Sequence, residues 1–451
     1  MLEYPYPSTQ ETVSRLQNLL RINTINPPGN EDVAAAYLQQ LFNEAGIENA
    51  IVEPFPRRTS IWARLKGNGN KKPLLLVSHL DVVPVEQEKW SVDPFGGEII
   101  DSMIYGRGAV DMKQMTAIQL TLLLYFAQLQ KDQQFTLDRD LIFLSVADEE
   151  RGGEAGMQWI IKNKPEWVDA EFALNEGGGS GVQIGGKRIY PCEAAQKGPF
   201  PVTLRVTGEP GHGSIPHQNN ALAILARAVH RVAAKPLPLH ITETSRQFFA
   251  KIAKTQRMPQ QLMLQLAANP VFANTIYNAL PDQNLANVFR AMTHNTASPT
   301  VMHAGQAHNV IPGEASVHLD CRLIPGQNQA DIERELRERI QDPRVHIEVD
   351  DGLPGYEFSS KTPIFAAISR ATAKEDPDGI VAPYLFPAVS DSRFLARAGV
   401  TCYGFIPMKP ETGVPPIQLL AHGHDERISI ANVEFGLRVL FQTLIELQTK
   451  S

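Results

Sequence analysis

The sequence has few of the features that mark disulfide scaffolds, thiolate metal sites or membrane proteins. Its 451 residues include only three cysteines, Cys192, Cys321 and Cys402, which lie far apart and have no neighbouring cysteine or histidine. A disulfide framework and a cysteine metal site are therefore not expected. No segment approaches ~18 uninterrupted apolar residues, so the sequence predicts no membrane-spanning helix.

An excess of positive charge is also missing. The chain has 42 Lys and Arg against 49 Asp and Glu, for a net charge of −7. This balance gives no reason to expect a nucleic acid or an anionic membrane surface as partner. The first residues lack a basic segment followed by an apolar one, so no secretory signal is expected. Together with the few cysteines, this favours a cytoplasmic location.

What the chain does have is enough apolar sequence for two cores. Hydrophobic residues make up 43% and charged residues 20% of the sequence, as in soluble globular proteins. A length of 451 residues exceeds one ordinary core and predicts two domains.

The stretch LLLVSHLDVVP, residues 74–84, joins an apolar run to polar residues. The run predicts a strand buried on both faces, as in a parallel sheet. His79 and Asp81 follow at its carboxyl end, where open α/β sheets place their ligands. A His beside a carboxylate is a common arrangement at metal sites. A helix cap or a surface pair would explain the same two residues.

Two further predicted strands end in acidic residues. Residues 140–147 precede Asp148, Glu149 and Glu150, and residues 171–174 precede Asn175 and Glu176. Adjacent carboxylates repel one another unless a cation or protons compensate, although such a triplet is often just a surface charge run.

Asp111 lies between a Gly-rich loop and a predicted helix over residues 112–130. It could be the N-cap of this helix or a metal ligand. Because carboxyl ends of parallel strands meet at one edge, the sequence predicts a site of one His and several carboxylates. Zinc, cobalt and manganese suit such ligands.

The middle of the chain has a different pattern. Residues 201–349 read as strand, helix, strand, strand, helix, strand, which predicts an α+β domain on an antiparallel sheet. Residues 236–299 add a mainly helical insertion. The last hundred residues resume the α/β pattern. We therefore predict an α/β catalytic domain over 1–195 and 353–451, with a mixed, mainly parallel sheet, and an inserted domain over 196–352.

Six ordered motifs resemble the M20 family of zinc-dependent peptidases and amidohydrolases: SHLDVVP, YGRGAVDMK, ADEERGGEAG, NEGGG, GEPGHGSIP and AHGHDERI. The resemblance runs through nearly the whole chain and combines traits of the aminoacylase-1 and carboxypeptidase S branches. It implies a zinc-exopeptidase-like catalytic domain and a ferredoxin-like lid, through which the chain could form a homodimer.

The resemblance also implies a two-metal site, with zinc as the expected ion and cobalt or manganese as substitutes. Asp81 would orient a metal-binding His. The spacing His-x-x-x-Glu in AHGHDE selects His422 over His424. The implied ligands are His79, Asp111, Glu150, Glu176 and His422.

Catalytic and substrate-binding roles follow from the same resemblance. Glu149 matches the general base, and His212 matches a His that stabilises the oxyanion, which a partner subunit supplies in dimeric members. His217 has no counterpart. The residues implied to contact substrate are Asn309, Arg322 and Arg393; for Arg322, a strand-edge salt bridge is the less favoured alternative.

Small departures from the family pattern occur at Ser78 and Gln114, where glycine is usual, and neither removes a ligand. The expected function is dizinc-dependent hydrolysis of N-acyl amino acids. Alternatives are a dipeptidase or carboxypeptidase of the same family, an inactive binding protein, and a monometallic lyase or phosphatase. The acyl specificity is open, because Phe248, Phe249, Met258, Met263 and Phe272 of the insertion could line an acyl pocket or form helix core.

Overall fold

The computed structural model describes residues 4–449, and the chain folds into two compact units. The first unit contains Met1–Glu193, Ser359–Ala382 and Ser390–Ser451. The second contains Ala194–Phe358 and Pro383–Val389. The second unit thus takes in a short segment from beyond residue 358, in addition to the stretch over 196–352 that we assigned to an inserted domain.

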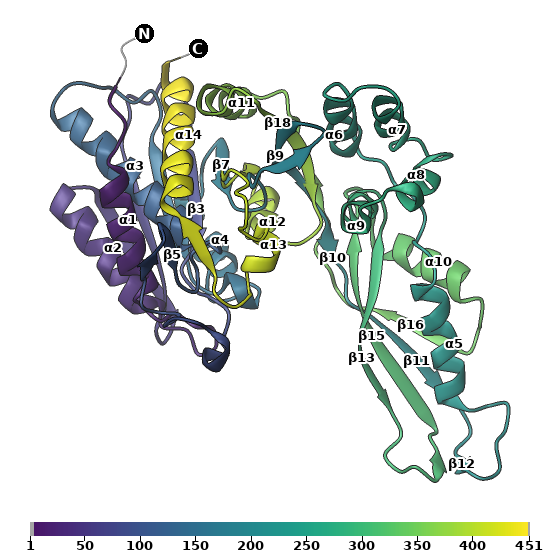
Figure 1. Ribbon diagram of the computed structural model, residues 1–451. Helices are drawn as coiled ribbons and strands as arrows, with labels where there is room; N and C mark the ends of the chain where they lie inside the picture. Colours follow the sequence, from purple (N-terminus) through teal and green to yellow (C-terminus); the bar gives the residue numbers. More distant parts are fainter. Residues whose placement is uncertain (1–3, 450–451) are drawn as a thin grey trace. The chain divides into compact units, whose positions relative to one another are not determined.

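A mixed sheet forms the centre of the first unit (Figure 1). The strands from β6 to β19 are parallel to one another, and β1, β2 and β9 run antiparallel to their neighbours. Both β3 and β6 are buried along their whole length, as expected of apolar strands inside a parallel sheet. The prediction of an α/β fold with a mainly parallel sheet is confirmed. The order across the sheet is β1 (Glu48–Phe55), β2 (Arg58–Leu65), β6 (Leu141–Val146), β3 (Leu74–His79), β7 (Phe172–Asn175), β19 (Thr401–Gly404) and β9 (Lys187–Gln196).

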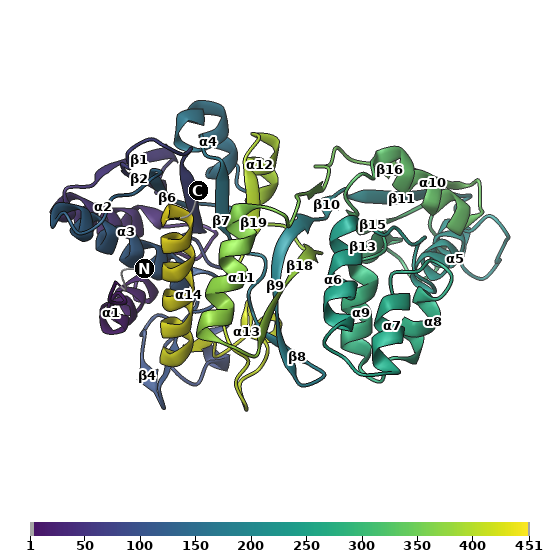
Figure 2. The same cartoon turned by 90° about the horizontal axis from the view of Figure 1, so that it is seen from above.

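Helices cover both faces of this sheet (Figure 2). One layer consists of α1 (Thr9–Leu20), α2 (Glu31–Ala45), α3 (Lys113–Lys131), α11 (Pro363–Glu375) and α14 (Ile430–Thr449). On the other face lie α4 (Met157–Asn163) and α12 (Ser392–Arg397). None of the helices in residues 4–449 combines the length and the apolar character that a membrane crossing requires.

Short elements complete the first unit. The hairpin partner β8 (Val182–Ile184) and β18 (Gly379–Phe386) pair with β9. A separate small sheet joins β20 (Arg427–Ser429), β5 (Met103–Tyr105) and β4 (Ile99–Ile100), and the single turn α13 (Ile417–Leu420) precedes it. All three cysteines are buried and unbridged, in agreement with the prediction of no disulfide framework.

The second unit is built on an antiparallel sheet in the order β10 (Gly198–Pro199), β15 (Glu314–Leu323), β11 (Val202–Thr207) and β16 (Val345–Val349), with β13 (Thr296–Ala304) also paired to β15. Two helices, α5 (Ala221–Ala233) and α10 (Gln329–Ile340), bury their apolar faces against this sheet in one core. A two-stranded ribbon, β12 (Gly211–His212) with β14 (Val310–Ile311), extends from it, and β17 (Tyr356–Glu357) pairs with the end of β9.

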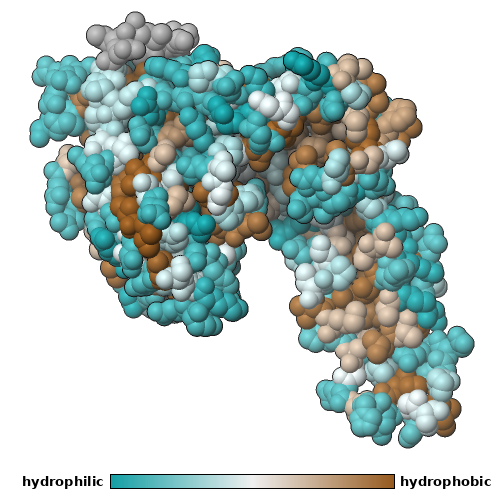
Figure 3. All heavy atoms as spheres, in the orientation of Figure 1, coloured by the Kyte–Doolittle hydropathy of each residue, from teal (hydrophilic) through white to brown (hydrophobic). Residues whose placement is uncertain are grey.

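The insertion of the second unit consists of α6 (Glu243–Ala253), α7 (Gln260–Leu266), α8 (Ala273–Ala279) and α9 (Gln283–Ala291). Phe248 and Phe249 are buried and stack edge-on against Phe289, so they form helix core. Met258 and Phe272 are 65% and 46% exposed, and brown spheres gather over α7 and α8 in Figure 3. The apolar residues of the insertion therefore divide between core and surface.

This division predicts different costs for two otherwise similar substitutions. Phe249→Ala should lower the free energy of unfolding by ~3–5 kcal/mol, because it removes a fully buried ring and leaves a cavity. Phe272→Ala, the matched control in the same insertion, should change it by less than ~0.5 kcal/mol. Urea denaturation of the two variants measures both values. Equal effects would contradict this assignment of core and surface.

Candidate metal centre

Ionisable side chains meet at the carboxyl ends of the parallel strands of the first unit. His79 is the last residue of β3, and Glu176 directly follows β7. Glu149 and Glu150 lie in η2 (Glu149–Arg151), a single 3₁₀ turn that follows β6. On an extended strand, neighbouring side chains point in opposite directions. Because Glu149 and Glu150 lie in a turn, they are not forced apart in this way.

Two clusters of potential metal ligands share one residue, Asp111. In the first, His79 Nε2 lies 3.2 Å from Asp111 Oδ1 and 3.9 Å from Glu176 Oε2. In the second, His422 Nε2 lies 3.2 Å from Asp111 Oδ2 and 3.3 Å from Glu150 Oε2. Each oxygen of Asp111 therefore faces a different cluster, which is the geometry of a carboxylate that bridges two cations.

The ring of His79 is held by a backbone carbonyl. Its Nδ1 lies 2.9 Å from the main-chain oxygen of Asp81, which can only accept, so Nδ1 carries the proton. In the neutral ring, the lone pair of Nε2 would then point to the first cluster, as metal binding requires. We expected Asp81 to orient His79, and the atom that does so is the carbonyl oxygen rather than the carboxylate.

The carboxylate of Asp81 holds the turn that carries the two glutamates instead. It accepts hydrogen bonds from the backbone N–H groups of Glu149 at 3.1 Å and Glu150 at 3.2 Å. A third bond comes from Asn26 Nδ2 at 2.9 Å. Asn26 was not singled out from the sequence, where only the turn residues NPPGN mark its loop. Asp81 therefore determines where both glutamates lie.

Glu426 plays a similar part for Asp111. It is fully buried, and its Oε1 accepts from the N–H groups of Gly108, Val110 and Asp111 at 2.8–3.2 Å. Arg107 pairs with its other oxygen at 2.6 Å. The sequence reading used Glu426 only to select His422, whereas its contacts fix the loop that presents Asp111. The N-cap of α3 is Met112, so Asp111 is not the cap.

The electrostatics of the two clusters fit positive ions. Burial raises the pKa of Glu176 well above its usual value, and burial also raises that of Glu150. Hydrogen bonds to Asp111 and Glu150 raise the pKa of His422 to about 10, while both histidines lower the pKa of Asp111. Protons on the histidines thus balance the carboxylates, and divalent cations would replace them.

The donor atoms suit borderline metal ions as well. Both clusters offer imidazole nitrogen and carboxylate oxygen, a set that zinc, cobalt and manganese accept. Within residues 4–449, the Oε1 atom of Glu150 is buried without a hydrogen-bond partner, so it is available to a ligand of another kind. The residues present therefore fit a pair of divalent cations.

Glu149 belongs to neither cluster. Burial and the charges of Glu176 and Asp391 raise its pKa well above the usual value. Arg393 Nη1 lies 3.8 Å from Glu149 Oε1. Arg393 itself is only 7% exposed, and it donates to the carbonyls of Ser390 and Gly152. The structure thus places Arg393 in the interior beside Glu149, and the contact with substrate that the resemblance implies stays a prediction.

The remaining predicted site residues lie in the second unit. His212 is exposed on β12, and its Nδ1 accepts from the N–H of Ser214 at 3.2 Å, which leaves Nε2 as the donor of the neutral ring. The carbonyl of Asn309 accepts from the N–H of Gly213 at 2.7 Å, so Asn309 and His212 lie at the same end of the β12–β14 ribbon. Arg322 lies on β15 and pairs with Asp320 at 2.6 Å.

The two histidines that we set aside lie elsewhere. His424 Nε2 lies 2.8 Å from Glu86, away from both clusters of ligands. His217 stands beside Gly211 in the second unit.

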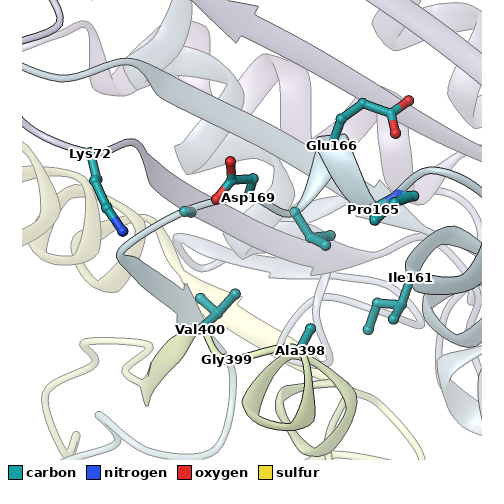
Figure 4. A pocket seen from close by; sticks show the side chains of 10 residues that line it. Lys72, Ile161, Pro165, Glu166, Asp169, Ala398, Gly399 and Val400 are labelled. Atoms are coloured by element: carbon teal, nitrogen blue, oxygen red, sulfur yellow. The ribbon is translucent and has the colours of Figure 1, made fainter.

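The pocket of about 420 Å³ in Figure 4 is not part of this centre. Lys72, Ala170 and Val400 line it and come just before β3, β7 and β19, so it lies at the amino ends of these strands. The candidate ligands lie at the opposite, carboxyl ends.

Comparison with known proteins identifies the family. The model of peptidase family M20/M25/M40 matches residues 75–446. A probable carboxypeptidase S-like protein 2 of Dictyostelium discoideum is 31% identical over 80% of this chain and 69% of its own length. The human N-fatty-acyl-amino acid synthase/hydrolase is 27% identical over 88% of this chain and 78% of its own length. Pig aminoacylase-1 is 28% identical over 96% and 94%.

Solved structures share the fold. An M20 family metallo-carboxypeptidase from Sulfolobus solfataricus superposes with a TM-score of 0.72 at 18% identity, covering 98% of this chain and 100% of that one. Human carnosine dipeptidase 1 gives a TM-score of 0.67 at 17% identity, with 99% and 100% covered.

The contacts of Asp81 predict that a neutral replacement will disturb metal binding. Asp81→Asn turns one acceptor oxygen into a donor that faces N–H groups, so the Glu149–Glu150 turn should shift. We expect cobalt affinity, measured by absorption titration, to fall ~10–100-fold with an unchanged circular dichroism spectrum. Glu86→Gln, which changes contacts with His424 and Lys89 but with none of the candidate ligands, is the control. Equal affinities in both variants would rule out this positioning role.

Proposed function

Because this chain belongs to peptidase family M20/M25/M40, and is therefore a hydrolase, we propose that it cleaves the amide bond of N-acyl amino acids. The observation that carries the proposal is the pair of ligand clusters joined by Asp111, with Glu149 next to them and in neither. The relatives named for N-fatty-acyl amino acids and for acylase activity support this substrate class.

We propose zinc as the metal in both clusters, one ion with His79 and Glu176, the other with Glu150 and His422, and Asp111 between them. Two bound zinc ions would lower the pKa of a water molecule and polarise the scissile carbonyl. Cobalt and manganese suit the same donors and serve as substitutes in experiments.

Glu149 is the proposed general base. Its carboxylate takes a proton from the attacking water, whose oxygen forms a bond to the carbonyl carbon. The proton then passes from Glu149 to the nitrogen as the carbon–nitrogen bond breaks, giving a carboxylic acid and a free amine. Arg393, whose Nη1 lies 3.8 Å from Glu149 Oε1, provides a positive charge beside this carboxylate.

The second unit supplies the proposed contacts to substrate. The Nε2–H of His212 is a suitable donor to the developing oxyanion, where one donor is worth ~100–1000-fold in rate. Asn309 and Arg322 are proposed to hold the carboxylate of the amino acid. Arg322 is suited to this because its guanidinium can exchange Asp320 for a substrate carboxylate in the same bidentate geometry.

A substrate panel tests the proposal. The zinc-loaded enzyme should hydrolyse N-acyl amino acids with a higher kcat/KM than dipeptides built on the same carboxyl-terminal residue, measured by amine release. Amidated substrates without a free carboxylate should be poor. Faster cleavage of dipeptides would instead make the protein a dipeptidase, and phosphatase or lyase activity without amide hydrolysis would reject the proposal.

Substitution of Glu149 separates catalysis from metal binding. Glu149→Gln should retain both metal ions, because the residue belongs to neither cluster, and should lower kcat by ~100–10,000-fold. Glu154→Gln, an exposed residue in the same loop, is the control and should leave kcat unchanged. Metal content by mass spectrometry and turnover of one N-acyl amino acid give the readout. Near-normal turnover in the Glu149 variant excludes it as the base.

A further inference from the structure

A second pocket of the first unit, of about 300 Å³, lies between the β8–β9 hairpin and the loop that contains α13. Its walls are mainly apolar. Val182 comes from the hairpin, and Val110 from the loop before α3. The remaining apolar residues used here, Met408, Val414, Ile417 and Leu420, come from the stretch between β19 and His422. This pocket takes no part in the functions assigned so far.

The segments that form the pocket are the same ones that carry the candidate metal ligands. Val110 is directly followed by Asp111, and Leu420 precedes His422 by two residues. Ser180, also in the wall, follows Glu176 by four residues. Three segments that carry candidate ligands thus also contribute to one apolar cavity.

Charged residues in the wall are already paired. Glu411 accepts from the hydroxyl of Ser429 at 2.7 Å. Lys409 donates to the carbonyl of Glu375, and Arg427 donates to the carbonyl of Asp425. The side chains of these three residues are directed to hydrogen-bond partners, and the apolar residues that make up most of the lining suit a hydrocarbon better than a polar ligand.

We propose that this pocket receives the hydrocarbon chain of the acyl group, so that the substrates are amino acids acylated with medium-length chains. This inference rests on the proposed function. A volume of about 300 Å³ has room for roughly ten groups of ~30 Å³, the share of one water molecule, and a methylene group is of similar size. Acetyl groups would leave the pocket mostly empty, and the part of a chain beyond about ten carbons would extend out of it.

The test compares acyl chains from acetyl to hexadecanoyl on a single amino acid. For the wild-type enzyme, kcat/KM should rise by about fourfold for each added methylene until the pocket is full, and then stop rising. A second series keeps the acetyl group and varies the amino acid side chain. If the pocket holds that side chain instead, this second series shows the length dependence and the proposal is wrong.

Pocket variants should move the optimum in opposite directions. Val414→Trp and, from the other wall, Val182→Phe fill the cavity and should shift the preferred acyl chain to fewer carbons. Ile417→Ala enlarges it and should shift the preference to more carbons. Leu419→Trp is the matched control, because Leu419 lies on the same turn of helix but is 68% exposed and outside the pocket.

The outcomes separate the two proposals. If the wild-type enzyme hydrolyses N-acyl amino acids and the three pocket variants keep its chain-length profile, the pocket assignment is wrong and the proposed function stands. If the wild-type enzyme hydrolyses no N-acyl amino acid at all, the proposed function fails and the pocket assignment fails with it.

Discussion

The repulsion between buried carboxylates is the constraint on which the first unit depends. Asp111, Glu150 and Glu176 approach one another at the edge of the sheet, out of water, and burial raises the pKa of both glutamates. Such a group of negative charges is unstable without compensation. His79 and His422 supply part of it when protonated, and two divalent cations would supply the rest.

A surrounding layer of hydrogen bonds keeps these side chains in place. Asp81 binds the backbone of Glu149 and Glu150, and Glu426 binds the backbone of the Asp111 loop. Both are themselves buried carboxylates; Asp81 is held by N–H donors, and Glu426 is held by N–H donors and by the guanidinium of Arg107. Acidic residues thus have two roles in this chain, as candidate metal ligands and as acceptors of backbone N–H groups. Only the contacts of each residue distinguish the two roles.

The sequence was sufficient to predict the arrangement of the strands and the group of side chains at their ends. Apolar runs that stop at His79, Glu149 and Glu176 predict a parallel sheet with polar residues at one edge, because strand ends must meet there. Which atom of each residue makes a given contact could not be predicted from the sequence. Nothing in the sequence distinguishes the carbonyl of Asp81 from its carboxylate as the partner of His79.

Long-range packing limited the prediction in other places. The importance of Asn26 and Glu426 depends on contacts with residues more than fifty and three hundred positions away, respectively, which no local pattern encodes. The same holds for the insertion, where the pattern of Phe and Met residues could not tell Phe249 in the core from Phe272 on the surface. The apolar cavity near His422 likewise arises from four separate parts of the chain.

The division of Asp111 between two clusters makes the two metal positions thermodynamically dependent. With one oxygen directed to each cluster, a first bound ion would fix the rotamer of Asp111 and so prepare half of the second position. At the same time it reduces the negative charge that attracts the second ion. Occupancy should therefore proceed in two unequal steps, and the stepwise affinities would describe the pair rather than two independent sites.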